Sequence, residues 1–76
     1  MLGKRVRHAR YAARMTQETL AHLTGLRQSH ISRIEKGTID DVVGDTLKVL
    51  ATALKVSPGY LLGLEEAPVQ RGPMTT

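Results

Sequence analysis

Apolar residues recur three or four positions apart along most of the chain, which is the spacing of one face of an α-helix. Near the N-terminus this stripe comprises Leu2, Val6, Ala9 and Ala13. It predicts a helix over about residues 2–14, with these side chains turned toward a core. No β-branched stretch alternates with polar residues, and phenylalanine and tryptophan are absent. The pattern therefore favours helices over strands.

A second helix is expected over about residues 17–24. Thr16 is a suitable N-cap, because its hydroxyl can accept a hydrogen bond from a free backbone N–H. Glu18 then lies in the first turn, where the helix macrodipole favours a negative charge. Gly25 is expected to end the helix, because glycine readily takes the positive φ of such an end. The side chains expected to face inward are Leu20, Ala21 and Thr24.

A third helix is expected over about residues 28–35, after a three-residue link, and Gly37 is expected to end it. Ile31 and Ile34 lie on its inward face. Leu26, in the link, is expected to fill the corner between the two helices. Two helices joined by a tight glycine turn, the second with a free outer face, are the features of a helix-turn-helix unit.

Two further helices follow a loop predicted over residues 38–44. Asp45 is expected to cap the fourth helix. The inward stripe of that helix comprises Leu47, Leu50, Ala51 and Leu54. Ser57 and Pro58 are a strong start signal, because an N-cap serine precedes a proline at the first helical position. The fifth helix is therefore expected to be short and to include residues 60–62.

Together these elements predict one all-α domain of five helices over residues 2–64. A chain of 76 residues is close to the lower limit for burying a sufficient core, so one domain is the most it can form. Residues 65–76 are mostly polar and contain two prolines. For this segment we expect a disordered tail or the stub of a linker.

Charge is distributed unevenly along the chain, whose formal net charge is +4. Residues 1–36 carry eight basic and two acidic side chains, whereas residues 37–76 carry three basic and five acidic ones. A basic half fits a surface that meets a polyanion, although a solvated basic surface looks the same on charge alone. Cysteine, a secretory signal and a membrane-spanning apolar run are all absent, so a cytoplasmic location is expected.

The outer face of the third helix has side chains that can read DNA bases. At roughly 100° per residue, Ser29 and Arg33 point away from the inward isoleucines. The polar residues of this face are Gln28, Ser29, Ser32 and Arg33, with His30 at the flank. Arginine can pair with two acceptors of guanine, glutamine with two groups of adenine, and serine with either base. Most polar helix faces are simply exposed to solvent and bind nothing. Here, however, the glycine turn and the basic N-terminal half favour DNA binding over that interpretation.

Residues 2–64 resemble the DNA-binding domain of the lambda-repressor-like family, also called Cro/CI or XRE. Around the predicted turn, the matching runs are Met15-Thr16-Gln17-Glu18, Leu20-Ala21 with Gly25, and Ile31-Ser32-Arg33-Ile34-Glu35-Lys36-Gly37. Downstream, they are Thr46-Leu47, Ala51, Leu54 and Ser57-Pro58-Gly59-Tyr60-Leu61-Leu62. Each motif is loose alone, and together they are specific. The resemblance implies a compact five-helix bundle that binds double-stranded DNA through its third helix in the major groove.

The resemblance also implies roles for single residues. Gln17 matches a family glutamine that binds a DNA phosphate and supports the start of the third helix, at a helix N-terminus that favours an anion. Arg10 and Glu35 match a buried structural ion pair, and losing one partner is expected to cost about 3 kcal/mol or more. The predicted DNA-binding residues, with the base-reading face among them, are Gln17, Arg27, Gln28, Ser29, His30, Ser32, Arg33, Lys36 and Thr38.

Two positions depart from the family pattern. Arg27 stands where a serine or threonine usually caps the third helix, and arginine cannot accept the capping hydrogen bond. We expect a contact with a phosphate or a base to compensate. Asp40 and Asp41 lie in the loop where family members often carry basic residues for the DNA backbone. We expect these aspartates to cap turns or to repel DNA that is out of register.

Other chemistry has little support in the sequence. The three histidines, His8, His22 and His30, match no metal-ligand spacing, so neither a metal nor a cofactor is expected. The acidic residues around the loop fit turns and caps better than a catalytic cluster. No nucleophile has a His/Asp setting and no glycine-rich phosphate loop occurs, so we predict that the protein is not an enzyme. The basic first helix lacks the aromatic residues of membrane-surface helices, so no membrane partner is expected.

Two functions fit the sequence. The first is a transcriptional regulator, a repressor that binds a palindromic operator as a homodimer, because one recognition helix reads only a few base pairs. Leu61, Leu62 and Leu64 are expected to be exposed and to form the dimer contact. The second is an antitoxin or interaction module, in which the helix-turn-helix domain is coupled to a toxin or a second domain. The added segment would then begin within residues 65–76.

Overall fold

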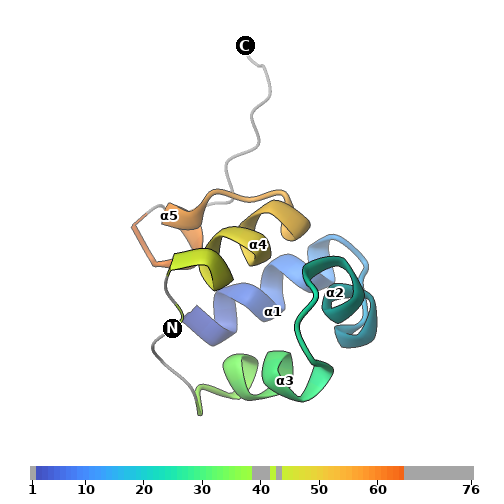
Figure 1. Cartoon of the computed structure of the whole chain (residues 1–76). Coiled ribbons are helices and arrows are strands. Elements are labelled where there is room, and N and C mark those ends of the chain that lie inside the picture. Colours follow the sequence, from blue (N-terminus) through green and yellow to red (C-terminus); the bar gives the residue numbers. More distant parts are fainter. Residues whose placement is uncertain (1, 39–41, 43, 65–76) are drawn as a thin grey trace.

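The computed structural model describes residues 2–38, 42 and 44–64, and over these residues it contains five helices and no strand (Figure 1). The helices are α1 (Leu2–Ala12), α2 (Gln17–Thr24), α3 (Gln28–Lys36), α4 (Gly44–Leu54) and α5 (Pro58–Leu61). The prediction of an all-α fold with five helices is confirmed. The expected tail over residues 65–76 and the roles of Asp40 and Asp41 lie outside the described residues.

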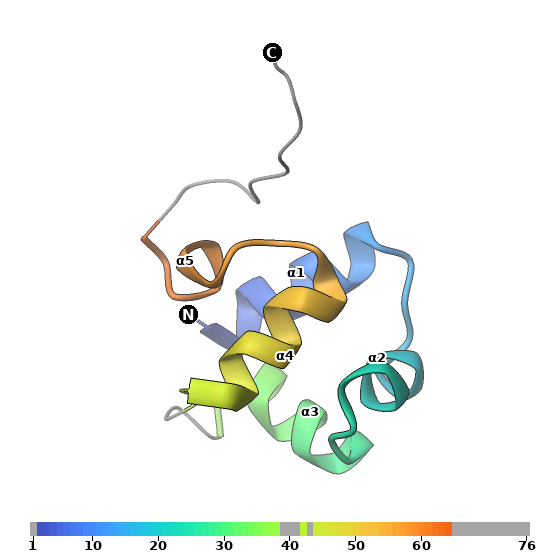
Figure 2. The same ribbon diagram turned by 45° about the horizontal axis from the view of Figure 1, so that its top comes forward.

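The core lies where α1 and α4 cross the middle of the domain, with α2 and α3 on one side of them and α5 on the other (Figure 2). α1 contacts α3, α4 and α5, so it links the two sides. The largest fully buried side chains come from all five helices and are Val6, Leu20, Ile31, Ile34, Leu50 and Leu61. Each predicted inward stripe contributes to this set, with Val6 in α1, Leu20 in α2, both isoleucines in α3 and Leu50 in α4.

Local signals set the ends of α2 and α5. The Thr16 hydroxyl accepts a hydrogen bond of 3.0 Å from the Thr19 backbone N–H, as expected of an N-cap. Ser57 accepts a bond of the same length from Tyr60, directly before Pro58. Gly25 ends α2 with a φ of 78°, a left-handed conformation that costs glycine little. These predicted caps are confirmed, and they place the turn between α2 and α3.

α1 begins at Leu2 as predicted, but it ends earlier than expected and makes a contact that the sequence does not indicate. The helix ends at Ala12, because Arg14 takes a φ of 59°, and Ala13 is exposed instead of facing the core. Near its start, Gly3 is buried against the C-terminal end of α3. A Cβ on Gly3 would overlap the carbonyl oxygens of Ile34 and Glu35, so only glycine lets the two backbones approach this closely. The apolar stripe does not indicate this contact.

Two further predictions are wrong. α4 begins at Gly44, so Asp45 lies inside the first turn and is not the N-cap. Its carboxylate is still favourable there, because the first turn carries the positive end of the macrodipole. Leu61, expected at the surface, is fully buried where α5 contacts α1 and α4. Leu62 and Leu64 are exposed as predicted, by 49% and 77%.

Candidate DNA-binding surface

α3 is sharply divided into a buried face and an exposed face. Ile31, Ile34 and Glu35 are buried, as predicted from the helical spacing. On the opposite side, Gln28, Ser29 and Arg33 are exposed, and His30 and Ser32 are half-buried at the flanks. Lys36 and Thr38 are exposed at the C-terminal end of the helix. The structure thus gathers the predicted base-reading side chains on one surface, and Arg27 adjoins them at the start of α3.

A buried ion pair ties α1 to α3. The Arg10 Nε donates to Glu35 Oε2 at 2.7 Å, and Arg10 Nη2 donates to Glu35 Oε1 at 3.0 Å. The third donor, Arg10 Nη1, reaches the Met15 carbonyl oxygen at 2.9 Å. The expected pair of Arg10 and Glu35 is therefore present, and it also holds the turn that leads into α2. Both groups have hydrogen-bonding partners, which is the condition for burying a charge without a large penalty.

The same carboxylate is connected to the exposed face of α3 through two glutamines. Gln17, the first residue of α2, donates from Nε2 to Glu35 Oε1 at 3.1 Å. Gln17 Oε1 accepts a bond of 2.7 Å from Nε2 of Gln28, the first residue of α3. The amide of Gln17 therefore supports the start of α3 in the way that the resemblance implies. It also fixes the orientation of Gln28 at the edge of the base-reading face.

Glu35 has a pKa below its ordinary value of 4.5. Burial of the carboxylate acts to raise this pKa, but the hydrogen bonds from Arg10 and Gln17 and the positive charge of Arg10 outweigh it. The hydrogen bond to Glu35 raises the pKa of Arg10, even though burial opposes the shift. Both shifts favour the charged forms, so the pair remains ionised at neutral pH.

Arg7 belongs to this network although it is absent from the predicted site. Its Nε lies 3.4 Å from Glu35 Oε1, and its side chain is half-exposed. The signal in the sequence was its position, three residues before Arg10 on the same face of α1. Arg10 in turn stacks on Tyr11, with 4.7 Å from the guanidinium carbon to the ring centroid. A half-exposed cation therefore lies directly beside the buried ion pair.

Arg27 occupies the N-cap position of α3 without a side-chain capping bond. Its backbone carbonyl accepts from His30 at 3.0 Å and from Ile31 at 3.1 Å, so the helix begins normally there. The Arg27 side chain is exposed. The backbone N–H groups at the start of α3 thus lack the acceptor that a serine or threonine would provide.

Within residues 2–38, 42 and 44–64, no group of three or more histidine, cysteine, aspartate or glutamate side chains is placed to hold a metal ion. None of the five helices in that part of the chain has the length and apolar character needed to cross a membrane.

Comparison with known proteins identifies the family of the chain. A family model described as helix-turn-helix matches residues 6–61. The chain belongs to this helix-turn-helix family. The matched region includes α2, α3 and α4 in full, together with the buried ion pair.

A curated relative is also a helix-turn-helix protein. An uncharacterised helix-turn-helix-type transcriptional regulator of Sinorhizobium fredii, y4dL, is 37% identical over 64 residues, covering 80% of this chain. The chain spans 33% of the length of that relative. The family match and this relative together identify the chain as a helix-turn-helix domain of the kind that occurs in transcriptional regulators.

Solved structures share the fold of this helix-turn-helix domain. The restriction-modification controller protein C.AhdI of Aeromonas hydrophila has a TM-score of 0.73 and 40% identity, over 79% of this chain and 89% of that one. The P22 c2 repressor, solved with a synthetic operator, has a TM-score of 0.78 and 31% identity, over 86% of this chain and 97% of that one. The resemblance to lambda-like repressors is confirmed.

We predict that acid weakens the fold through Glu35. Because its folded-state pKa lies below 4.5, the stability that it contributes is fully present above that pH. This stability is lost as the pH falls from 4.5 through the lower folded-state pKa. Urea unfolding followed by circular dichroism at a series of pH values measures the effect.

The Glu35→Gln variant provides the comparison. It is expected to lose about 3 kcal/mol at neutral pH, because Arg10 remains buried without a counter-charge. Its unfolding free energy should also depend less on pH across the same range. Glu18→Gln, at an exposed position of α2, is the matched control and should keep the wild-type profile. An identical acid profile in Glu35→Gln and wild type would contradict the assignment.

Proposed function

We propose that this domain is a sequence-specific DNA-binding repressor that reads operator DNA with the exposed face of α3. The observation that carries the proposal is the Gln28–Gln17–Glu35–Arg10 hydrogen-bond chain, which holds that face to α1 and α2. In this proposal the base-reading residues are Gln28, Ser29, Ser32 and Arg33. Arg33 pairs with guanine, and Gln28, oriented by Gln17, pairs with adenine.

DNA backbone contacts surround this face in the proposal. The amide of Gln17 already has two partners, so its backbone N–H, at the start of α2, is the group that we assign to a phosphate. Lys36 and Thr38 contact the backbone at the other end of α3. Arg27, at the start of α3, and His30, at its flank, also lie beside the DNA. A contact between the Arg27 cation and the DNA compensates for the missing cap of α3.

We propose that the domain acts as a homodimer on a palindromic operator. A single α3 reads only a few base pairs, whereas two copies related by a two-fold axis enter major grooves about 34 Å apart. Leu62 and Leu64 follow α5 and are exposed by 49% and 77%, so they supply the apolar contact. The P22 c2 repressor in complex with its synthetic operator supports the DNA partner. Such a regulator acts in the cytoplasm, where its DNA lies.

The antitoxin or two-domain alternative stays a prediction. The larger size of the Sinorhizobium fredii relative is compatible with a helix-turn-helix domain attached to further sequence. Co-purification of the full chain with the product of a neighbouring toxin gene would distinguish that alternative from a free-standing repressor.

Two substitutions on α3 are expected to separate base reading from backbone contact. Arg33→Ala should weaken operator binding by about 1–3 kcal/mol and relax the preference for operator over random DNA. Lys36→Ala removes the same charge from the same helix, but it should weaken both DNAs alike and lower the salt slope by about one. Fluorescence anisotropy with both DNAs at several salt concentrations measures this difference.

The same assay tests Arg27. Arg27→Ser is expected to stabilise the fold through an added cap and to weaken binding to both DNAs.

Each of these predictions has a result that contradicts it. If Arg33→Ala lowers binding to operator and random DNA by the same factor, the base-reading role of α3 is wrong. If Arg27→Ser binds DNA as wild type does, the compensating contact at Arg27 is wrong.

The dimer contact makes a separate prediction. Leu64→Ser is expected to reduce self-association and weaken binding to a full operator, while binding to a single half-site is unchanged. Leu23→Ser, also at an exposed leucine but on α2, is the control and should leave self-association unchanged. Light scattering with and without operator DNA measures the stoichiometry. A wild-type protein that stays monomeric on operator DNA would refute the dimer.

A further inference from the structure

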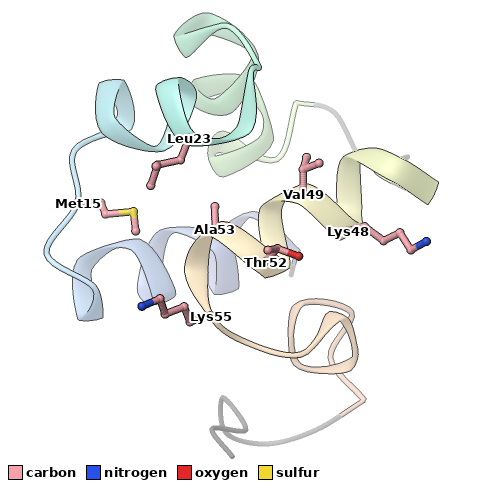
Figure 3. A pocket seen from close by; sticks show the side chains of 7 residues that line it. All are labelled: Met15, Leu23, Lys48, Val49, Thr52, Ala53 and Lys55. Carbon is pink, nitrogen blue, oxygen red and sulfur yellow. The ribbon is translucent and has the colours of Figure 1, made fainter.

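An apolar groove lies between α2 and α4, outside the DNA-binding surface (Figure 3). Its lining residues are Met15, Leu23, Lys48, Val49, Thr52, Ala53 and Lys55. Leu23 reaches over the groove from α2, and Val49 and Ala53 face it from α4 (Figure 3). None of the lining residues belongs to α3. A ligand in the groove therefore leaves the base-reading face open.

The groove exposes apolar side chains that the core does not use. Leu23 is 55% exposed and Val49 is 36% exposed, and neither belongs to the buried cluster of the domain. A single exposed leucine is ordinary, but two large apolar residues facing one groove form a contiguous surface. This is the surface that a partner's apolar residues could cover.

The charge around the groove indicates the chemistry of that partner. Lys48 and Lys55 extend at opposite ends of the groove, and among the residues that the structure describes no acidic side chain lines it (Figure 3). A second copy that met the groove with its own groove would bring the same two lysines, and therefore like charge, to the contact. An acidic partner is attracted instead.

The length of the groove limits the shape of the partner. The part of α4 that lines the groove extends from Lys48 to Ala53, five residues or about 8 Å along the helix. A partner helix with apolar residues at positions i, i+3 and i+4 presents a stripe of similar length. An acidic residue at one end of the stripe would then lie opposite Lys48.

We propose that the α2–α4 groove is a docking site for an acidic amphipathic helix of another protein. Leu23 and Val49 contact its apolar stripe, and Lys48 faces its carboxylates. Because the site is separate from α3, the partner and DNA bind at the same time. The docking site is a function in addition to DNA binding. Its test contains no DNA, so the docking proposal and the DNA-binding proposal can each be wrong without the other.

The probes are two synthetic helical peptides with the same leucine stripe. One carries glutamates at the flanking positions, and the other carries lysines. Titration of the ¹⁵N-labelled full chain followed by NMR locates and measures binding. The glutamate peptide is expected to shift the amides of Leu23 and of residues 48–55. The lysine peptide should bind about fivefold more weakly, because it replaces an attraction to the exposed Lys48 by a repulsion.

Variants assign the contacts. Leu23→Ser is expected to weaken binding of the glutamate peptide by about tenfold, because most of a leucine contact is lost. Its control is Ala13→Ser, at an exposed apolar position that does not line the groove. Lys48→Glu should reduce the preference for the glutamate peptide or reverse it. Lys4→Glu makes the same charge change on α1, away from the groove, and should preserve the preference.

Three outcomes overturn the proposal. The first is equal binding of both peptides, or binding that Leu23→Ser leaves unchanged. The second is peptide-induced shifts that lie on α3 or α1 and not along the groove. The third is concentration-dependent shifts at Leu23 and Val49 without any peptide, which would assign the groove to a second copy of the chain. A circular dichroism melt of each variant separates loss of contact from loss of fold.

Discussion

The buried carboxylate of Glu35 is the interaction on which the arrangement of the first three helices depends. It lies on α3, and it receives hydrogen bonds from Arg7 and Arg10 on α1 and from Gln17 on α2. Because a buried carboxylate is costly without partners, every donor must keep its place for the charge to remain stable. This requirement fixes the angle between the helices more narrowly than apolar contacts alone, which tolerate repacking. The exposed face of α3 is therefore presented by a charged network and not by the isoleucines alone.

The network also extends from the buried interior to the exposed face of α3, where it orders a polar side chain. Gln28 is exposed at the first position of α3, where a long side chain would sample many rotamers, yet its amide is held by Gln17. Ordering this side chain before binding removes part of the entropy cost of a base contact. The same pre-ordering does not extend to the groove between α2 and α4, where exposed apolar residues and two lysines suit an adaptable contact with another protein.

The helix-turn-helix could be predicted from the sequence because its determinants are local. Thr16 and Gly25 act within one turn of the residues that they cap, and the stripe of Ile31 and Ile34 follows from helical spacing. The end of α1 could not be predicted, because Arg14 adopts a positive φ that its residue type does not favour. The tight approach at Gly3 and the burial of Leu61 depend on which helices pack together, and spacing along one helix does not contain that information.

Selection of bound sequences from a random pool of double-stranded DNA shows whether the exposed face of α3 reads DNA sequence as part of a symmetric pair. Such a pair should select a palindromic consensus whose half-sites are centred about 10 base pairs, or one turn of DNA, apart. Recovery of DNA with no enriched sequence would contradict base reading by α3. An enriched sequence without two-fold symmetry would contradict the symmetric pair.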